Sequence, residues 1–143
     1  YKKPGTKDEF PWHQDNGYTF IEPQAYLTCW VALTDTDETN GCPCVMPGLH
    51  KKGTLHHETT DIGYEIPLDS SDSVTLPLKA GSIAVFSSLT PHRTGPNLNE
   101  NIRKAYILQY APEGSKRLIS HSLSEEVNEE SRQYFVLKEG SKV

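Results

Sequence analysis

The sequence predicts a single domain made mostly of short β-strands, arranged as a jelly roll or the related, cupin-like double-stranded β-helix. Ten glycines and ten prolines interrupt the chain, and the segments between them are short and rich in β-branched and aromatic residues. With 143 residues the chain is long enough to bury a sizeable core, and it contains no internal repeat or linker. We therefore expect residues 1–143 to form one domain, with residues 113–143 as its C-terminal extension.

The first half of the chain contains the clearest strand. Residues 25–33 are apolar at successive positions, which predicts a central strand with both faces buried. Residues 12–15 form the end of an earlier strand, and residues 42–46 form a short later one that a Pro-Gly pair terminates. Residues 35–41 are rich in turn-forming side chains. This half is thus expected to supply three strands joined by loops.

The second half is expected to contain a hairpin, a long loop and a further strand. Residues 74–78 and 82–88 have strand patterns, and the Lys-Ala-Gly turn between them predicts a hairpin. Residues 58–73 show little periodicity and many polar side chains, which predicts a long loop of the kind that often covers a functional site. Residues 102–110 have the pattern of another strand, which ends before a proline.

The tail of the chain combines two different signals. Ser122 and Glu125 have the spacing of a capping box, which predicts a short helix. Residues 134–137 have a strand pattern, and residues 138–141 predict a turn after it. The tail is therefore expected to contain one short helix and one strand.

Composition excludes several classes of partner and location. The net charge of −5 gives no indication of a nucleic-acid-binding surface. No apolar run approaches the length of a membrane span, and no signal peptide is visible. Three cysteines, an odd number, argue against a disulfide framework. We therefore expect a cytoplasmic protein without nucleic-acid or membrane partners.

Three side chains have the composition of a metal site. On an extended strand, His13 and Asp15 would point to the same face because they are two residues apart. His92, just after the strand predicted at residues 82–88, would supply a third ligand from a loop rim. Two histidines and one carboxylate on one side of an ion are typical of non-heme Fe(II) oxygenases, which keep the remaining positions open. An isolated H-x-D sequence is nevertheless common, so the surrounding motifs decide its significance.

These surroundings resemble a known family over residues 12–112. The chain carries, in one order, Trp12-His-Gln-Asp15, Leu27-Thr-Cys-Trp-Val-Ala-Leu33, Asn40-Gly-Cys42, Val45-Met-Pro-Gly-Leu-His50, Ala80-Gly81, Pro91-His92, Gly95-Pro-Asn97 and Arg103. Together these motifs resemble the phytanoyl-CoA dioxygenase family of Fe(II)- and 2-oxoglutarate-dependent oxygenases. The resemblance implies that His13, Asp15 and His92 are the iron ligands.

The resemblance also implies residues for the co-substrate. Arg103, eleven positions after His92, matches the arginine that binds the far carboxylate of 2-oxoglutarate. Thr94 matches a hydroxyl position that helps to hold the same carboxylate, and Trp30 matches a position near the co-substrate. Simpler explanations exist for each: a surface arginine, a turn-capping threonine and a core tryptophan. Gln14 is expected to point away from the ligands if its strand is regular.

The function that follows from the resemblance is hydroxylation of a small organic substrate with O2 and 2-oxoglutarate, releasing succinate and CO2. Two alternatives remain open. One is a non-catalytic β-sandwich that retains the fold of this family without its activity. The other is a cupin-like metal enzyme that does not use 2-oxoglutarate, in which Arg103 would have no role.

The position of the H-x-D motif leads to two further expectations. Members of this family usually carry a long helical region before the motif, whereas twelve residues precede His13 here. We therefore expect a core domain that lacks this helical region, with an incomplete pocket and an unpaired sheet edge. An exposed edge is a pairing surface, which predicts a homodimer.

Overall fold

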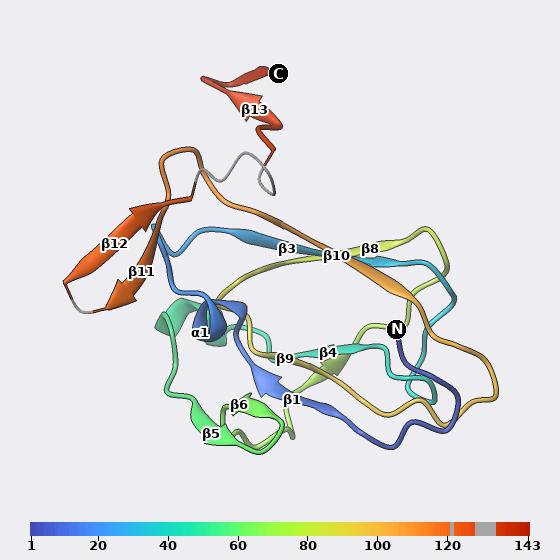
Figure 1. The fold of residues 1–143 in the computed structure, drawn as a ribbon. Coiled ribbons are helices and arrows are strands. Elements are labelled where there is room, and N and C mark those ends of the chain that lie inside the picture. The colour runs from blue at the N-terminus through green and yellow to red at the C-terminus, as the bar shows by residue number, and fades with distance from the viewer. Residues whose placement is uncertain (121, 128–133) are drawn as a thin grey trace.

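The computed structural model describes residues 1–120, 122–127 and 134–143, and two antiparallel sheets form its body (Figure 1). We call them the β1 sheet and the β3 sheet. The β1 sheet has the strand order β1 (Phe10–His13), β9 (His92–Thr94), β4 (Pro43–Val45) and β7 (Val74–Thr75). The β3 sheet has the order β10 (Ala105–Tyr110), β3 (Leu27–Ala32) and β8 (Ile83–Ser87). The two sheets face each other as the layers of a double-stranded β-helix, as predicted.

Smaller elements flank the two sheets. Two hairpins and a third sheet contain the remaining strands, which are β5 (Glu58–Thr60) with β6 (Gly63–Glu65), β13 (Leu137–Lys138) with β14 (Ser141–Lys142), and β2 (Ile21–Glu22) with β11 (Lys116–Ser120) and β12 (Leu123–Glu126). The helices are α1 (Asp15–Tyr18) and the 3₁₀ helix η1 (Leu49–Lys52). Within the described part of the chain, no helix has the length and apolar character needed to cross a membrane.

Strand β3 lies in the centre of its sheet, but only one of its faces is fully buried. Thr28, Trp30 and Ala32 point toward the β1 sheet and are buried, whereas alternate residues on the other face are half-buried or exposed. The prediction of a central strand is confirmed, and the prediction that both faces are buried is wrong. Among the described elements, only the β1 sheet covers the β3 sheet, so the outer face of β3 stays partly exposed although it is apolar.

The main apolar cluster lies outside the space between the two sheets. Trp12, Cys44, Met46 and Ile66 form this cluster, and Leu49, Leu55 and Leu68 pack against it. Because neighbouring residues on a strand point to opposite faces, Trp12 on the outer face of β1 places His13 on the inner face. The apolar cluster thus packs against the outer face of the β1 sheet, and the space between the two sheets holds His13 together with the buried Trp30 and Ala32.

The hairpin predicted over residues 74–88 does not form. Strand β7 pairs with β4 in the β1 sheet, whereas β8 pairs with β3 in the other sheet. The turn exists, with Gly81 at φ 89° and its N–H donating to the carbonyl of Ala32 at 2.7 Å, but it ends a crossing between sheets. Alternating apolar residues predict strands without specifying their partners, and a jelly roll requires such crossings.

Two other local predictions are also wrong. Residues 58–73, predicted as a loop, contain the β5–β6 hairpin, in which Gly63, at φ 124°, begins β6 directly after the turn. Most of the predicted helix at residues 122–125 belongs to strand β12, which pairs with β11 in antiparallel register, and an ion pair joins the opposite side chains of Arg117 and Glu125. Both regions lie on the surface and lack the apolar alternation that marks a strand, so cross-strand pairing decides their structure.

The end of the tail agrees with the sequence in part. A strand forms at Leu137–Lys138 and pairs with β14 across a turn at Glu139 and Gly140, which confirms the turn predicted over residues 138–141. The predicted strand began three residues earlier, at Tyr134. Residues 128–133 lie outside the described part of the chain, and the assignment of residues 113–143 as an extension of the same domain stays a prediction.

Candidate metal centre

Pairing of two strands brings the predicted histidines together. Strand β1 pairs with β9 in an antiparallel register that places His13 opposite His92 and Phe10 opposite Thr94, with an irregularity between the two pairs. Directly opposite residues share one face of a sheet. The two imidazole rings therefore lie side by side on the inner face, with their centroids 4.1 Å apart.

Asp15 reaches the same place by a different route from the one predicted. Strand β1 ends at His13, Gln14 remains extended at φ −107° and ψ 139°, and Asp15 is the first residue of α1. The regular strand over residues 12–15 is thus wrong in its last two residues. The start of α1, rather than strand alternation alone, brings the carboxylate back toward the imidazoles.

The three side chains form a compact set of ligand atoms. Asp15 Oδ1 lies 3.8 Å from His13 Nε2 and 3.7 Å from His92 Nε2, and one ligand atom from each residue lies within 4.8 Å of the others. His13 and His92 are buried and Asp15 is half-buried. Two imidazole nitrogens and one carboxylate oxygen converging from one side are a donor set that fits a divalent transition metal.

Backbone carbonyls determine which ring nitrogen of each histidine is free. His13 Nδ1 lies 2.8 Å from the carbonyl of Pro11, and His92 Nδ1 lies 3.0 Å from the carbonyl of Thr90. A carbonyl oxygen only accepts hydrogen bonds, so each Nδ1 donates and each Nε2 keeps its lone pair. Both Nε2 atoms are the ones that face Asp15, which is the tautomer and orientation that metal coordination requires.

Burial keeps both imidazoles uncharged. Removal from solvent lowers the pKa of His13 to about 4, and the neighbouring His92 contributes in the same direction. Burial also lowers the pKa of His92, against the opposing effect of Asp15. At neutral pH the two histidines are therefore neutral, and a neutral imidazole is the form that binds a metal.

Thr28 holds the other oxygen of Asp15, a contact that the sequence interpretation missed. Its hydroxyl donates to Asp15 Oδ2, and it accepts a 3.5 Å hydrogen bond from Gln109 Nε2 on the neighbouring strand. The amide nitrogen of Gln109 can only donate, so the single hydroxyl proton of Thr28 is directed to the carboxylate. A polar residue at an inward position of an apolar central strand was the available signal, since Thr28 is 1% exposed.

We expect Thr28→Val to weaken metal binding by about 10- to 100-fold, the usual effect of losing a contact that orients a metal ligand. Valine keeps the volume of threonine but leaves Asp15 Oδ2 without its donor, so the carboxylate becomes free to rotate. Titration of Co(II) followed by visible absorption measures this change. Thr28→Ser should restore most of the affinity.

Thr36→Val is the matched control, because Thr36 is also buried but its hydroxyl is bound to the carbonyl of Leu78. Equal Co(II) affinity in the Thr28→Val and Thr36→Val proteins would contradict a positioning role for Thr28.

Gln14, which lies between His13 and Asp15 in the sequence, connects the surrounding segments by hydrogen bonds. Its side chain is fully buried and donates to the carbonyls of Gly53 and Leu89, while its Oε1 accepts from the N–H of Leu55 at 2.7 Å. Its backbone N–H donates to His57 Nε2 at 3.0 Å. The middle residue of the H-x-D motif thus ties the start of α1 to residues 53–57 and to the loop that leads into β9.

Arg103 is an interior side chain. It is 6% exposed, its guanidinium lies 5.3 Å from the centre of the Trp30 ring, and its Nε has no hydrogen-bond partner among the described residues. Burial lowers the pKa of this guanidinium. A buried cation with an unpaired N–H is costly unless an anion binds to it, so its surroundings fit a carboxylate ligand. The alternative of a surface arginine is wrong.

Trp30 and Thr94 occupy positions consistent with the predicted site. Trp30 is buried on the inner face of β3 and lies beneath Arg103, so it serves the core and contacts the candidate co-substrate residue. Thr94 lies two residues after His92 on β9 and so shares its inward face. The roles of Thr94 and Trp30 in binding a co-substrate stay predictions.

Comparison with known proteins gives a consistent picture. Residues 1–105 match the family model described as phytanoyl-CoA dioxygenase (PhyH). A phytanoyl-CoA dioxygenase of Arabidopsis thaliana is 33% identical over 114 residues, which are 76% of this chain and 40% of the relative. A methylphosphonate hydroxylase of Gimesia maris is 32% identical over 111 residues, which are 77% of this chain and 42% of the relative.

A solved structure shares the fold and extends the comparison to a ligand. The crystal structure of EvdO2 from Micromonospora carbonacea var. aurantiaca, complexed with 2-oxoglutarate, superposes with a TM-score of 0.71 and is 29% identical. The match covers 90% of this chain and 51% of EvdO2, and this chain spans about 40% of the curated relatives. The family model, the relatives and the fold agree, and the chain belongs to the phytanoyl-CoA dioxygenase family.

Proposed function

We propose that this chain is the core of an Fe(II)- and 2-oxoglutarate-dependent dioxygenase that hydroxylates a small organic substrate. The single observation that carries the proposal is the pairing of two features between the same two sheets. These are the converging ligand atoms of His13, Asp15 and His92, and the buried guanidinium of Arg103 with its unpaired Nε. The family of the chain and the 2-oxoglutarate bound to EvdO2 support the same assignment.

Each residue would have a defined task. His13 and His92 would bind Fe(II) through Nε2 and Asp15 through Oδ1, which leaves the remaining coordination positions open. Arg103 would form a planar, bidentate pair with the far carboxylate of 2-oxoglutarate and so orient the co-substrate. Bound Fe(II) would supply the activation of O2 that couples conversion of 2-oxoglutarate to succinate and CO2 with hydroxylation of the substrate.

The structure disfavours the two alternatives on physical grounds. A cupin-like enzyme without 2-oxoglutarate would leave the guanidinium of Arg103 buried without an anion, at a cost of several kcal/mol by the usual order of magnitude. A non-catalytic remnant would have no need for two histidines whose Nδ1 atoms are both held by backbone carbonyls. Dioxygenase chemistry explains both features.

Anaerobic titration tests the proposal without requiring the substrate. Fe(II) and 2-oxoglutarate together should produce a weak visible charge-transfer band, and admission of O2 should convert 2-oxoglutarate to succinate. Neither signal should appear when 2-oxoglutarate is replaced by succinate. If the protein binds Fe(II) but never produces the band or succinate, the assignment of 2-oxoglutarate is wrong.

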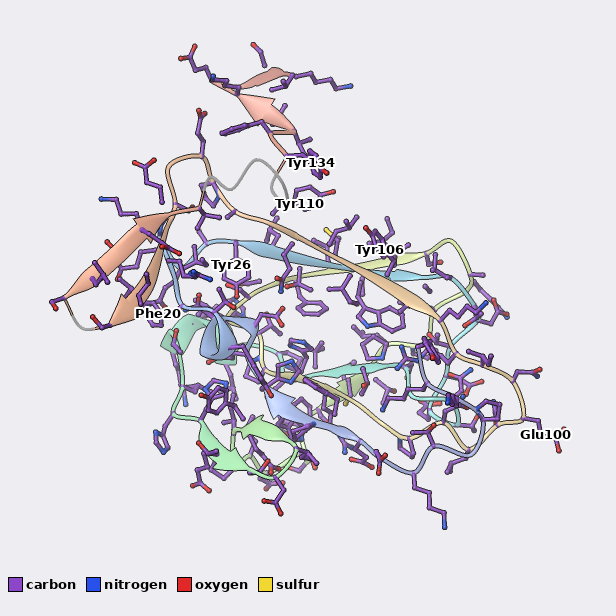
Figure 2. All side chains as sticks on the ribbon, viewed as in Figure 1. Phe20, Tyr26, Glu100, Tyr106, Tyr110 and Tyr134 are labelled. Atoms are coloured by element: carbon purple, nitrogen blue, oxygen red, sulfur yellow. The ribbon has the colours of Figure 1, made fainter. Side chains whose placement is uncertain are left out.

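We also propose that the outer face of the β3 sheet and its edges form a homodimer interface. Strands β10 and β8 are the outermost strands of this sheet. Its outer face exposes a set of large apolar side chains, namely Leu27, Ile83, Val85, Tyr106 and Tyr110. Tyr106 and Tyr110 lie on the side of β10 away from the β1 sheet (Figure 2). Exposed apolar patches of this kind mark interaction sites.

We expect sedimentation velocity to show a concentration-dependent dimer that Val85→Lys converts to a monomer, because the lysine would place a charge on the apolar outer face at edge strand β8. Ile119→Lys, at an exposed position on β11, is the control and should leave the dimer intact. A wild-type protein that stays monomeric at the highest soluble concentration would contradict the interface.

For the cellular location we propose the cytoplasm. The support is chemical, because Cys29, Cys42 and Cys44 are all free thiols. Burial raises the pKa of Cys42 to about 11, which keeps that thiol protonated and unreactive. Fractionation of cells followed by detection of the protein tests the location directly.

A further inference from the structure

We propose that the substrate places an uncharged, apolar ring against three aromatic side chains next to the metal centre. Phe10, Tyr18 and Tyr64 make up this aromatic rim. The inference deepens the proposed function by naming a substrate class, and it rests on the metal centre described above. It follows from four observations: continuity with His13, rigidity, exposure and the surrounding charges.

The aromatic rim is continuous with a metal ligand. The Phe10 ring lies edge-on to His13 with centroids 4.6 Å apart, and the Tyr18 ring is perpendicular to His13 at 5.4 Å. Phe10 and Tyr18 are nearly parallel, with centroids 6.2 Å apart and an interplanar angle of 28°. Tyr64 extends the row, with its ring 5.1 Å from Tyr18. A molecule resting on this row is therefore next to the imidazole ring of His13.

Backbone hydrogen bonds hold Tyr18, the middle residue of the rim, in a fixed position. The hydroxyl of Tyr18 accepts from the N–H of Tyr64 at 2.9 Å and donates to the carbonyl of Tyr64 at 3.2 Å. These two bonds connect α1 to strand β6. A side chain at Gly63 would be 2.6 Å from the same hydroxyl, so the glycine allows this close approach. A preformed surface binds a rigid partner without a cost of ordering its own side chains.

The rim is open to solvent although it adjoins buried ligands. Phe10, Tyr18 and Tyr64 are 42%, 41% and 41% exposed. Ile107 on the inner face of β10, which pairs with Trp30, is also 46% exposed. Apolar surfaces beside a buried polar group are typical of small-molecule sites, where the polar group performs chemistry and the apolar walls hold the substrate.

Two cationic side chains from segments next to β1 and β9 are already engaged. Arg93, which follows His92, points to the outer face, where it pairs with Glu9 at 2.8 Å and lies over Trp12. Lys2 donates from Nζ to the carbonyls of Asp8, Thr94 and Gly95. Arg103 is assigned to the co-substrate, so a strongly anionic substrate would find no counter-charge in these three residues. The rim thus favours an uncharged ring over an anion such as the methylphosphonate named for the Gimesia maris relative.

Proton relaxation of small probes in the presence of Mn(II)-loaded protein tests the proposal without turnover. Two probes of different chemistry are cyclohexylmethanol, which carries an uncharged ring, and methylphosphonate, which is anionic. We expect the Mn(II) to broaden the ring protons of cyclohexylmethanol and to leave methylphosphonate close to its behaviour with metal-free protein. The reverse pattern, or no broadening of cyclohexylmethanol, overturns the proposed substrate class.

Variants of Tyr64 test whether cyclohexylmethanol binds at the rim. Tyr64 is suitable because its ring contact is with Tyr18 and not with a metal ligand. Tyr64→Ala should weaken binding of cyclohexylmethanol by roughly three- to tenfold, the size expected for one aromatic contact. Tyr64→Phe should bind as the wild type does, because it keeps the ring. Tyr134→Ala is the matched control, since Tyr134 is 82% exposed in the C-terminal tail (Figure 2). Equal weakening by Tyr64→Ala and Tyr134→Ala overturns the rim.

The same experiment distinguishes failure of the rim from failure of the proposed function. Mn(II) affinity is measured first, by the relaxation of water protons. If the wild-type protein does not bind Mn(II), the metal centre and the rim proposal that rests on it both fail. If it binds Mn(II) but the probe is unaffected, only the rim proposal fails.

Discussion

Asp15→Ala is expected to lower Fe(II) affinity by at least about 100-fold and to abolish succinate production, since removal of a coordinating group should exceed the effect of losing its supporting contacts. Asp15 supplies the only carboxylate of the described ligand set, and its Oδ1 lies within 4 Å of both imidazole nitrogens. Two neutral histidines alone provide no charge to balance a divalent cation. The loss should therefore appear in binding as well as in turnover.

Two further variants are needed to interpret the effect of Asp15→Ala. Asp15→Asn keeps the shape of the side chain and an acceptor for Thr28, so it separates the effect of charge from that of geometry. Asp35→Ala is the control, because Asp35 is an exposed aspartate at the start of the 35–41 loop, where it forms an ion pair with Lys79. Isothermal titration with Fe(II) under anaerobic conditions measures the affinities. Unchanged Fe(II) affinity in Asp15→Ala would show that the metal centre is wrongly placed.

Arg103→Met should lower 2-oxoglutarate affinity by about 100-fold while Fe(II) affinity stays within about twofold. The first figure is the usual order of magnitude for losing one partner of a buried, hydrogen-bonded charge pair. Methionine has similar length and no charge, so the far carboxylate would lose its counter-charge. Arg103→Lys should lose nearly as much, because an ammonium group cannot form the planar bidentate pair. Titration of the charge-transfer band with 2-oxoglutarate gives the 2-oxoglutarate affinity, and anaerobic titration with Fe(II) gives the Fe(II) affinity.

Although Arg103→Met should weaken 2-oxoglutarate binding, it should stabilise the protein in the absence of ligands. Arg103→Met removes a buried guanidinium whose Nε is unpaired, so the free energy of unfolding without ligands should rise. Thermal unfolding with and without 2-oxoglutarate measures this. Added 2-oxoglutarate should raise the midpoint of the wild type and leave that of Arg103→Met unchanged.

Arg117→Met is the control for Arg103, since Arg117 lies on β11 and pairs with Glu125 at the surface. It should leave 2-oxoglutarate affinity at the wild-type value. A wild-type affinity in Arg103→Met as well would mean that the buried cation serves another anion, and the proposed co-substrate site would be wrong.

The parts of the fold that the sequence predicts are those marked by burial. Strand β3, β4 and β10 carry runs of apolar side chains and form close to where they were expected. Two of the regions that were predicted wrongly lie on the surface. The β5–β6 hairpin and strand β12 carry polar residues, and the capping-box spacing of Ser122 and Glu125 is a local signal that pairing with β11 overrides.

Local sequence patterns also do not specify which strand pairs with which. Residues 74–88 contain two strands and a turn, as predicted, but the strands belong to different sheets. Pairing depends on contacts between segments far apart in the chain, such as β8 with β3, and not on the residues of either strand alone. A hairpin and a crossing connection can share the same local pattern.

By itself, the sequence determined the identities of the chemical groups: His13, Asp15 and His92 as donors, Arg103 as the cation, and the order of motifs that places them in one family. Only the tertiary structure decided their states. Pairing of β1 with β9 brings the imidazoles together, backbone carbonyls orient their rings, and Thr28 holds the carboxylate. The fold also buries Arg103 with an Nε that has no hydrogen-bond partner among the described residues. The reason is physical, because side-chain types are local properties, whereas distance, burial and hydrogen-bond partners depend on residues far away in the chain.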